Sequence, residues 1–404
     1  MKRKVLKNVF YNIIASVIST GVSQLWVFPV LAKMFNETQY GNILFMIGIV
    51  NVIILTIGNA LGDIRLTENE KYCKKGITGD FNRLLTIGSI SSILATIIIM
   101  LVFKDILIDG NKLIVITLPI MSVFGTIYSY LAAIFRLKLL FKQNLKVNII
   151  LSIGNVLGLV LAYITKNWTL PFLIGYLLAV MYQTKKTLFF KESLKKSVLY
   201  KKTSIKYTAL SFSYLIKSSI NYVDRFVITP ILGANMLSIY TVASIFGKCA
   251  SIAIQPIANV ALGYYAQDNF KMTKKKFWVI NLLTIFFGII MYIIALMFSG
   301  IFIKILYPSY VCSATEYISI ANISAILTTI TAIIQPSILK CANVAWQIFI
   351  QLGYGILVVV LSLIFIKRSG LYGFCYASII ANLCKILFML LLGHLEIQKK
   401  EIEV

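Results

Sequence analysis

The chain has 404 residues, of which 59% are hydrophobic and only 13% are charged, and its mean hydropathy is +0.87. A soluble domain is about 45–50% apolar and about 25% charged, so this composition predicts a protein whose surplus apolar surface faces lipid. The formal net charge of +25 comes from 39 Lys and Arg against 14 Asp and Glu, and the basic residues lie mostly between apolar runs. That placement is typical of loops beside anionic lipid headgroups, and the motifs of DNA- and RNA-binding modules are absent, so we expect no nucleic-acid partner.

Cysteine and histidine usage argues against metal and disulfide sites. The six cysteines form no CxxC pair, and most lie in apolar runs, where a free thiol behaves as a small hydrophobic group. The only histidine, His394, lies at the predicted end of the last helix, and a single His excludes a multi-His metal site. We therefore expect no metal, no cofactor and no catalytic residue.

Twelve apolar stretches are long enough to span the hydrocarbon core of a bilayer, which takes about 20 helical residues. They are too long for barrel strands, and a helix satisfies its own backbone hydrogen bonds in lipid. The first six predicted helices cover residues 9–32, 40–63, 81–103, 113–135, 145–165 and 168–188. The second six cover residues 204–231, 236–262, 277–303, 316–339, 345–366 and 370–393. The expected fold is all-α, a polytopic membrane protein of about 12 transmembrane helices.

The charges of the predicted loops support this count and indicate an orientation. If the N-terminus is cytoplasmic, 28 Lys and Arg lie in loops or at span ends on the cytoplasmic side, against seven on the opposite side. This is the positive-inside distribution, to which Lys367 and Arg368 are a local exception. We expect a multi-pass protein of the bacterial plasma membrane with both termini in the cytoplasm.

The densest basic loop, residues 185–206, divides the predicted helices into six and six, and transporters are commonly built from two such halves. An internal similarity supports two halves. Pro29 and Pro230 are each followed by two aliphatic residues, a short polar link and a tyrosine that opens the next helix. We expect an N-terminal six-helix bundle, a cytoplasmic basic linker, a C-terminal six-helix bundle and a cytoplasmic tail at residues 1–190, 191–203, 204–395 and 396–404.

Two motifs resemble those of a known family. The stretch Asn221-Tyr-Val-Asp-Arg-Phe-Val-Ile-Thr-Pro-Ile-Leu-Gly233, followed by Tyr240-Thr-Val-Ala-Ser, resembles the seventh-helix signature of Wzx-type polysaccharide flippases. Phe28-Pro-Val-Leu-Ala-Lys, followed by Tyr40-Gly41, resembles the motif after their first helix. These flippases belong to the multidrug/oligosaccharidyl-lipid/polysaccharide exporter (MOP) superfamily, which also includes drug antiporters and lipid II flippases. The resemblance covers nearly the whole chain in helix number, halves and loop pattern.

The resemblance implies a V-shaped pair of six-helix bundles that works by alternating access, with helices 1, 2, 7 and 8 around a central cavity. It implies that the cargo is an undecaprenyl-pyrophosphate-linked oligosaccharide, carried to the outer leaflet for O-antigen, capsule or exopolysaccharide synthesis. Expected partners are this cargo, membrane lipids, a polysaccharide polymerase and a chain-length regulator. Because the sequence lacks a GxxxxGK[ST] nucleotide-binding loop, we expect an ion gradient to drive transport.

Ionisable side chains inside the predicted spans are the first candidate site residues, because a charge at bilayer depth is costly and by default faces a cavity or a partner. The basic ones can replace the water around a pyrophosphate, and they are Lys217, Arg225, Lys248 and Lys385. Two acids, Asp224 and Glu316, are the residues that we expect to take up the driving proton or sodium ion.

Polar stripes on the predicted helices supply further candidates. On a helical wheel, Lys217, Asn221, Asp224 and Arg225 fit within an arc of about 100°. Hydroxyl and amide groups can bind sugar hydroxyls, and the residues that we expect to do so are Asn12, Ser16, Asn59, Asn221, Gln255 and Asn259.

Simpler interpretations stay open for these residues and for the whole protein. Asp224 and Arg225 can form a structural ion pair or a cap, buried lysines can snorkel to the interface, and small polar stripes can hold helices together. The protein can also be a drug antiporter of the same superfamily, although cationic drugs typically need buried acids and this chain has more buried bases. A membrane polymerase or ligase usually carries a large external loop, whereas the predicted external loops are short.

Overall fold

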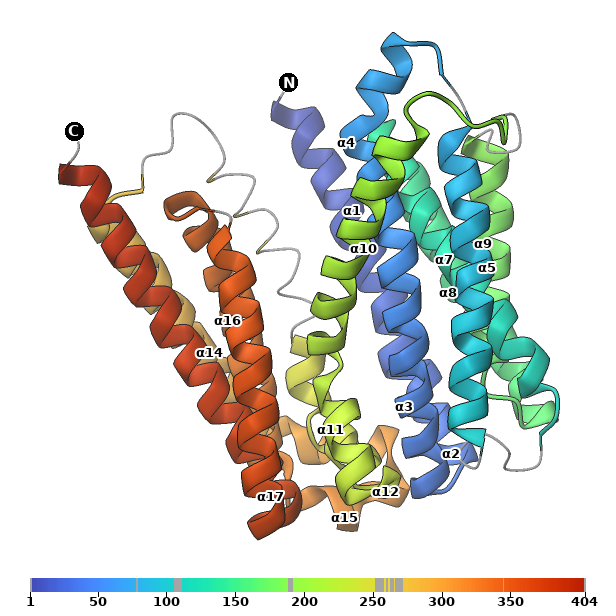
Figure 1. The fold of residues 1–404 in the computed structure, drawn as a ribbon. Helices are drawn as coiled ribbons and strands as arrows, with labels where there is room; N and C mark the ends of the chain where they lie inside the picture. The colour runs from blue at the N-terminus through green and yellow to red at the C-terminus, as the bar shows by residue number, and fades with distance from the viewer. Residues whose placement is uncertain are drawn as a thin grey trace. The chain divides into compact units, whose positions relative to one another are not determined.

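The structure, a computed structural model, describes residues 2–77, 79–104, 111–187, 192–250, 272–343 and 345–402, together with Ala258, Ala261 and Tyr265. Over these ranges every regular element is a helix and no residue lies in a strand. The backbone divides into two compact units, Met1–Tyr222 (unit 1) and Val223–Val404 (unit 2). Within each unit, long helices run side by side (Figure 1).

Unit 1 begins with two long helices that each contain one turn of π-helix. The first consists of α1 (Lys2–Val22), η1 (Ser23–Val27) and α2 (Phe28–Met34). The second consists of α3 (Glu37–Ile54), η2 (Leu55–Asn59) and α4 (Ala60–Lys74). A capping box starts α3, because Asn36 and Gln39 each accept a hydrogen bond from the backbone N–H of the other. Single π-turns are frequent at functional sites, and the second one ends at Asn59.

The remaining helices of unit 1 pack around α7. They are α5 (Asp80–Val102), α7 (Ile114–Leu137), α8 (Phe141–Thr165), α9 (Leu170–Thr187) and α10 (Tyr200–Asn221). Helix α7 contacts α3, α4, α5 and α9, and its Leu118, Tyr130 and Leu131 side chains are fully buried. Helix α8 packs against α1 and α9, and α10 packs against α4, which places α10 in unit 1.

Unit 2 is built on three long helices. Its elements are α11 (Val223–Leu232), α12 (Ala234–Ala243), α14 (Lys274–Leu306), η4 (Pro308–Tyr310), α15 (Val311–Thr315), α16 (Ile318–Cys341) and α17 (Ala345–Ile402). The core joins α14, α16 and α17 through buried apolar side chains such as Phe277, Ile334, Ile338 and Met389. Element α17 is two helices that meet at a break in backbone geometry at Ser369 and Gly370.

Eight helical stretches of the described residues are long and apolar enough to cross a membrane. The longest of them, in α17, contains two predicted helices on either side of the break. Helices α9 and α10 are not among these eight because they are more polar. Helix α9 ends in Gln183, Lys185 and Lys186, and α10 carries Lys206 and Lys217. In the predicted span 236–262, only residues up to 250 together with Ala258 and Ala261 are described. The chain is therefore a multi-pass membrane protein, and the expected all-α polytopic fold is confirmed.

Three boundaries differ from the expectation. The predicted helix 204–231 starts at Tyr200 and is broken at Tyr222 into α10 and α11. The two units divide at that break, whereas we had placed the division in the linker 191–203. The expected tail 396–404 is helical as far as Ile402, because α17 continues past its apolar part into charged residues.

Candidate functional site

An ion pair joins two of the predicted site residues within unit 2. Asp224 lies in the first turn of α11, which begins directly after the break at Tyr222. One carboxylate oxygen accepts from the backbone N–H of Arg225 at 2.9 Å, and the other accepts from Lys248 Nζ at 3.2 Å. A helix N-terminus favours a carboxylate, so the break in the helix itself helps to hold the charge of Asp224. The pair is only partly buried, with side-chain exposures of 18% for Asp224 and 31% for Lys248.

Aromatic packing fixes the position of the Lys248 ammonium. Its Nζ lies 5.0 Å from the centre of the Tyr240 ring, within the range of a cation–π contact. The Tyr240 ring is buried and meets the Phe374 ring edge-on at 5.2 Å between centroids. The charge of Arg225 also acts on Lys248. The Lys248 ammonium, the Arg225 guanidinium and the Asp224 carboxylate are thus close together, and the packed Tyr240 and Phe374 rings lie beside Lys248.

A second cation lies over a tyrosine in the same unit. Lys385 Nζ is 4.6 Å from the centre of the Tyr354 ring, and both residues belong to α17. Buried Asn382 donates to the Tyr354 hydroxyl at 3.4 Å and receives a hydrogen bond from Thr328 of α16 at 3.4 Å. Ser324 and Ser378 share a hydrogen bond of 2.6 Å between the same two helices. Among the described residues Lys385 makes no ion pair, and its ammonium lies over a ring that does not neutralise its charge.

The charge of Asp224 also acts on the Tyr354 hydroxyl, so Asp224, Arg225, Lys248, Lys385 and Tyr354 form one cluster with more positive than negative charge. We call it the unit 2 cation cluster. It combines ammonium and guanidinium donors with hydroxyl and amide groups, which together suit an anionic group that carries sugar hydroxyls. Within the cluster, the ion pair joins Asp224 of α11 directly to Lys248.

Other predicted residues belong to unit 1. Asn59 accepts a hydrogen bond of 2.6 Å from Ser129 of α7, and Asn12 accepts one of 2.9 Å from Asn144 of α8. Both contacts hold helices together, which agrees with the interpretation of polar stripes as interhelical contacts. Ser16 is exposed, and Asn221 is the exposed last residue of α10.

Lys217 is also in unit 1, exposed on α10, with Nζ 5.9 Å from the centre of the Tyr214 ring. The structure thus assigns Lys217 and Arg225 to different units. Glu316 is exposed at the junction of α15 and α16, where its backbone oxygen accepts a hydrogen bond of 3.3 Å from the Tyr372 hydroxyl of α17. Gln255 and Asn259 lie outside the described residues.

Sequence reasoning missed the contacts of a second set of charges, in α4. Tyr214 of α10 donates to Asp63 at 2.5 Å, and Lys206 of α10 pairs with Glu68. Arg65 makes two hydrogen bonds, of 2.8 and 2.6 Å, to the carboxylate of Glu192. The charges of Asp63, Arg65 and Glu68 at the end of a predicted apolar span were the available signal, but the partners from α10 and the segment before it are more than 120 residues away. These contacts attach α10 and the preceding segment to α4.

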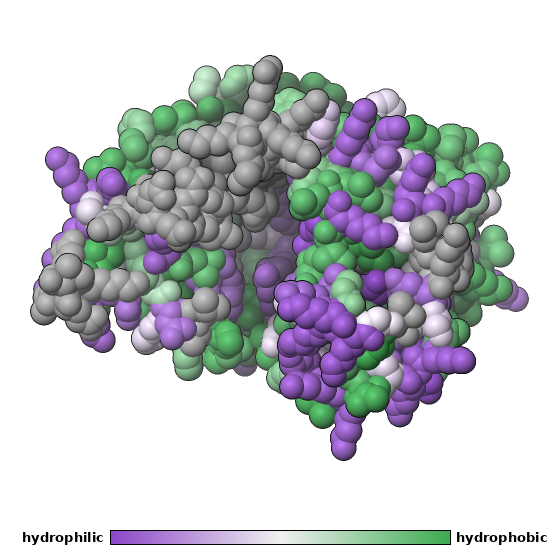
Figure 2. Space-filling model, turned by 90° about the horizontal axis from the view of Figure 1, so that it is seen from above, coloured by the Kyte–Doolittle hydropathy of each residue, from purple (hydrophilic) through white to green (hydrophobic). Residues whose placement is uncertain are grey.

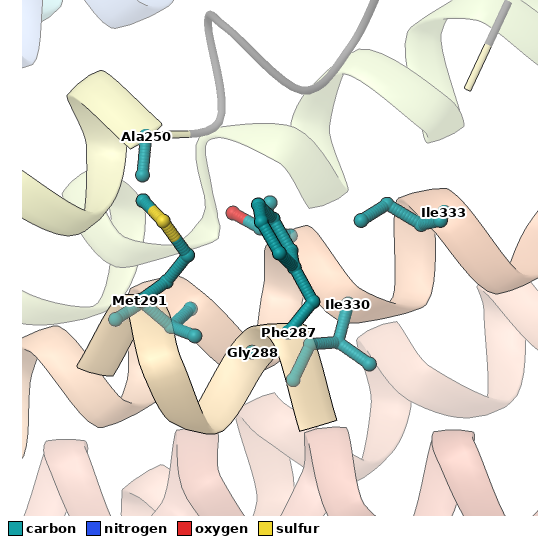
Figure 3. Close-up of a pocket in the computed structure, with 8 residues that line it drawn as sticks. Ala250, Phe287, Gly288, Met291, Ile330 and Ile333 are labelled. Atoms are coloured by element: carbon teal, nitrogen blue, oxygen red, sulfur yellow. The ribbon is translucent and has the colours of Figure 1, made fainter. Parts of the chain in front are cut away.

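An apolar pocket lies in unit 2 between α14 and α16 (Figure 3). Phe287 and Met291 of α14 and Ile330 and Ile333 of α16 line it, below Ala250. Its one hydroxyl, that of Thr329, donates to the backbone of its own helix. The pocket therefore offers nothing to a charged ligand. Over the described part of the chain, no three His, Cys, Asp or Glu side chains are grouped so as to hold a metal ion.

Solved structures of transporters share this fold, although no protein-family model and no curated protein matches the sequence. An inward-facing multidrug resistance MATE family transporter of the MOP superfamily is 11% identical, with a TM-score of 0.63 over 95% of this chain and 95% of that chain. The lipid II flippase MurJ, in an inward closed conformation, is 14% identical, with a TM-score of 0.67 over 96% of this chain and 86% of that chain. A MATE in complex with MaL6 is 13% identical, with a TM-score of 0.65 over 97% and 96%.

The chain therefore has the fold of MOP-superfamily transporters. The expectation drawn from the motifs at Phe28 and Asn221 is confirmed at the level of this fold.

Proposed function

We propose that this protein is a flippase that moves an undecaprenyl-pyrophosphate-linked oligosaccharide from the cytoplasmic to the outer leaflet by alternating access. The observation that carries the proposal is the unit 2 cation cluster. It places Arg225, Lys248 and Lys385 in one helical unit of a membrane protein with Asp224 as the carboxylate partner. Charges at such depth are retained where they meet an anionic group or a counter-charge.

The chemistry of the cargo fits this excess of cations. A pyrophosphate concentrates negative charge and acceptor oxygens, and hydrocarbon solvates it poorly. Lys and Arg side chains can replace its hydration shell, and the hydroxyls and amides of Tyr354, Asn382 and Ser378 can bind sugar hydroxyls. The polyprenyl tail can stay in the lipid, so the protein needs to shelter only the head group.

Release of the head group needs a driving force, because cations that capture an anion also retain it. We propose that Asp224 supplies it by competing for Lys248. When Asp224 is ionised it holds the Lys248 ammonium at 3.2 Å, and when a proton neutralises the carboxylate the ammonium is available to a phosphate. Loss of that proton returns the Lys248 ammonium to Asp224 and displaces the head group, so the charge of Asp224 controls release. Glu316 is exposed, and we assign it no direct contact with the cargo.

The proposed pathway is the synthesis of a surface polysaccharide, such as O-antigen, capsule or exopolysaccharide. The membrane would be the bacterial plasma membrane, and a polysaccharide polymerase and a chain-length regulator would act on the flipped product. Drug antiport is the competing function, since the structures that share the fold include a multidrug transporter. The cation cluster favours an anionic cargo over the cationic drugs that such antiporters export.

Reconstitution into liposomes tests the proposal. We expect purified protein to expose a fluorescent polyprenyl-pyrophosphate-linked saccharide to an external quencher faster than empty liposomes do. Lys385→Ala and Lys248→Ala should each lower the rate at least tenfold, because each removes a charge-assisted contact. Lys304→Ala, which removes an exposed cation at the end of α14, is the matched control and should transport normally.

The same liposomes separate the alternatives. Uptake of a cationic dye driven by a proton gradient, without movement of the labelled lipid, would identify a drug antiporter and refute the flippase. Equal flipping by wild type and by the Lys248 and Lys385 variants would refute the role of the cation cluster.

A further inference from the structure

Buried polar contacts hold the segment that precedes α10, residues 192–199, against the start of α5. Asp80, fully buried in the first turn of α5, accepts from the backbone N–H of Ser197 at 2.8 Å and from its hydroxyl at 2.5 Å. Asn82 donates to the backbone oxygen of Glu192 at 3.2 Å. Gly79 has φ of +117°, and a Cβ there would lie 2.7 Å from the backbone oxygens of Ser193 and Lys195. Residues 192–199 are therefore held in one conformation against the start of α5.

Residues 192–199 and the helices beside them carry a group of exposed cations. They come from the segment itself, from the first turn of α10 and from α5, and they are Arg83, Lys195, Lys196, Lys201 and Lys202. We call this group the basic platform. Over the ranges that the structure describes, none of the five makes an ion pair with a carboxylate. Like charges held together without a counter-charge repel each other, so an external anion would stabilise this arrangement.

Two of these cations converge on one aromatic ring. Arg83 Cζ lies 5.7 Å and Lys196 Nζ lies 4.9 Å from the centre of the Tyr200 ring. The Tyr200 side chain is half-buried and starts α10. The Tyr200 ring is thus within cation–π range of both a guanidinium and an ammonium, and it lies at the end of a helix whose first backbone N–H groups are directed outward.

Two apolar side chains project from the same segment. Val198 is 92% exposed and Leu194 is 59% exposed, although polar contacts on either side of them hold the backbone in place. Apolar side chains next to Lys and Arg are typical of surfaces that lie in the bilayer interface. Figure 2 looks onto this end of unit 1, where hydrophilic side chains gather and hydrophobic ones lie among them. Electrostatic and apolar contacts are therefore both available to a lipid.

We propose that the basic platform binds the phosphodiester headgroup of an anionic membrane lipid, with Arg83 and Lys196 around the phosphate and Leu194 and Val198 in the acyl boundary. This site is separate from the unit 2 cation cluster and goes beyond the proposed transport function. The lipid anchors the N-terminal end of α10 to the membrane surface. An attraction of this kind contributes about a fivefold change in affinity for each cation near an anionic surface, and salt screens it.

Lipid retention by the purified full-length protein tests the proposal. The probes are dioleoylphosphatidylglycerol, which is anionic, and dioleoylphosphatidylcholine, which is neutral, titrated into the protein in a neutral detergent and counted by native mass spectrometry. We expect wild type to prefer the anionic lipid. Arg83→Gln combined with Lys196→Gln should weaken that preference about 20-fold, which is about fivefold for each charge removed. The matched control is Lys142→Gln combined with Lys146→Gln, which removes two exposed cations of α8.

Further variants keep the result unambiguous. Leu194→Ser with Val198→Ser changes no charge and no described polar contact, so it should fold normally and lower retention of both lipids. An unchanged preference for the anionic lipid in the Arg83 and Lys196 variant would overturn the proposal, as would an equal loss in the Lys142 and Lys146 control. If the Arg83 and Lys196 variant loses binding of a polyprenyl pyrophosphate but not of phosphatidylglycerol, the platform is a cargo site and the proposal is wrong.

Discussion

Lys248 lies between a carboxylate and an aromatic ring, and its two contacts have different consequences for the protein. The ion pair with Asp224 satisfies a charge that the low-dielectric interior would otherwise penalise. The Tyr240 ring holds the ammonium in place without neutralising it. A lysine held in this way can exchange its carboxylate for a phosphate without leaving its position. Its structural and transport roles can therefore be separated by mutation.

Lys248→Met should destabilise the protein by about 2 kcal/mol, because it leaves the Asp224 carboxylate without its ammonium. Asp224→Asn combined with Lys248→Met should recover most of that loss, since neither charge then remains. Flipping should stay lost in both, because the ammonium that binds phosphate is absent. Thermal unfolding in detergent and the liposome assay measure the two effects. Recovery of flipping in the double variant would show that Lys248 is only structural.

Arg65 makes the strongest ion pair of unit 1, with two parallel hydrogen bonds to Glu192, a contact to the Tyr130 hydroxyl at 3.3 Å and the Phe81 ring 4.5 Å away. Arg65→Ala should lower the free energy of unfolding by about 3 kcal/mol, because it leaves the partly buried carboxylate of Glu192 without its cation. Arg65→Lys should recover only part of this, since an ammonium cannot make the paired bonds.

The control for Arg65 is Lys74→Ala, which breaks the exposed pair between Lys74 and Glu70. Exposed pairs contribute little, so its unfolding midpoint should match that of wild type. Equal midpoints for the Arg65 and Lys74 variants would contradict a stabilising role for the Arg65 pair.

The site residues of unit 2 were predictable as individual charges but not as contacts. Lys248, Arg225, Lys385 and Asp224 are conspicuous in the sequence because a charge is rare in an apolar helix. The pairing of Asp224 with Lys248 depends on how α11 meets the helix that carries Lys248, and no periodicity of one helix contains that information. The same reason explains why the attachment of α10 to Asp63 was missed.

Glycines set the distance between α8 and α9. Gly154 and Gly158 are four residues apart on α8, the spacing that lets membrane helices approach closely. A Cβ at Gly158 would lie 2.5 Å from the backbone oxygen of Leu170 and 2.6 Å from Pro171 Cα. A Cβ at Gly154 would lie 2.7 Å from Gly175 Cα. The two backbones are therefore in direct contact, and this contact fixes one side of unit 1.

Gly158→Ala should destabilise the protein by about 1–3 kcal/mol, because the added methyl group meets backbone atoms that cannot move aside. The control is Gly353→Ala in α17, where a Cβ would meet nothing within 4 Å. That change should be neutral or stabilise by up to about 1 kcal/mol through helix propensity. Thermal unfolding of both variants in the same detergent measures the difference. Similar midpoints would show that α8 and α9 do not depend on this contact.

Helix positions in this chain were largely predictable, because lipid requires about 20 apolar residues for each span. The predicted 113–135 and 145–165 agree with α7 and α8 within a few residues. The break at Tyr222 was not predictable, because no proline or glycine marks it and the polar face continues across it from Lys217 to Arg225. The π-turns at Ser23 and Leu55 give no sequence signal either.

At the scale of the whole molecule, basic residues mark one side of the predicted membrane topology. The loops assigned to the cytoplasm carry 28 Lys and Arg, and the opposite side carries seven. This asymmetry sets the direction of the proposed transport, because the cargo is assembled on the basic side. The exception is the pair Lys367 and Arg368, next to the break of α17 at Gly370. The φ of +55° and ψ of −130° at Gly370 suit a residue without a side chain, so the chain reverses there and not elsewhere in α17.

Labelling of single cysteines tests this orientation on a background in which all six native cysteines are replaced and flipping is retained. We expect Lys367→Cys to react with a membrane-impermeant maleimide in intact cells, because one predicted span separates it from the C-terminus and one from the α16–α17 loop, which are both predicted to be cytoplasmic. Lys142→Cys, exposed at the start of α8, should react only after the membrane is permeabilised. If Lys367→Cys is protected and Lys142→Cys is labelled, the molecule is inserted the other way. The basic platform and the loops beside it would then face the outside, and the proposed direction of flipping would be wrong along with the topology.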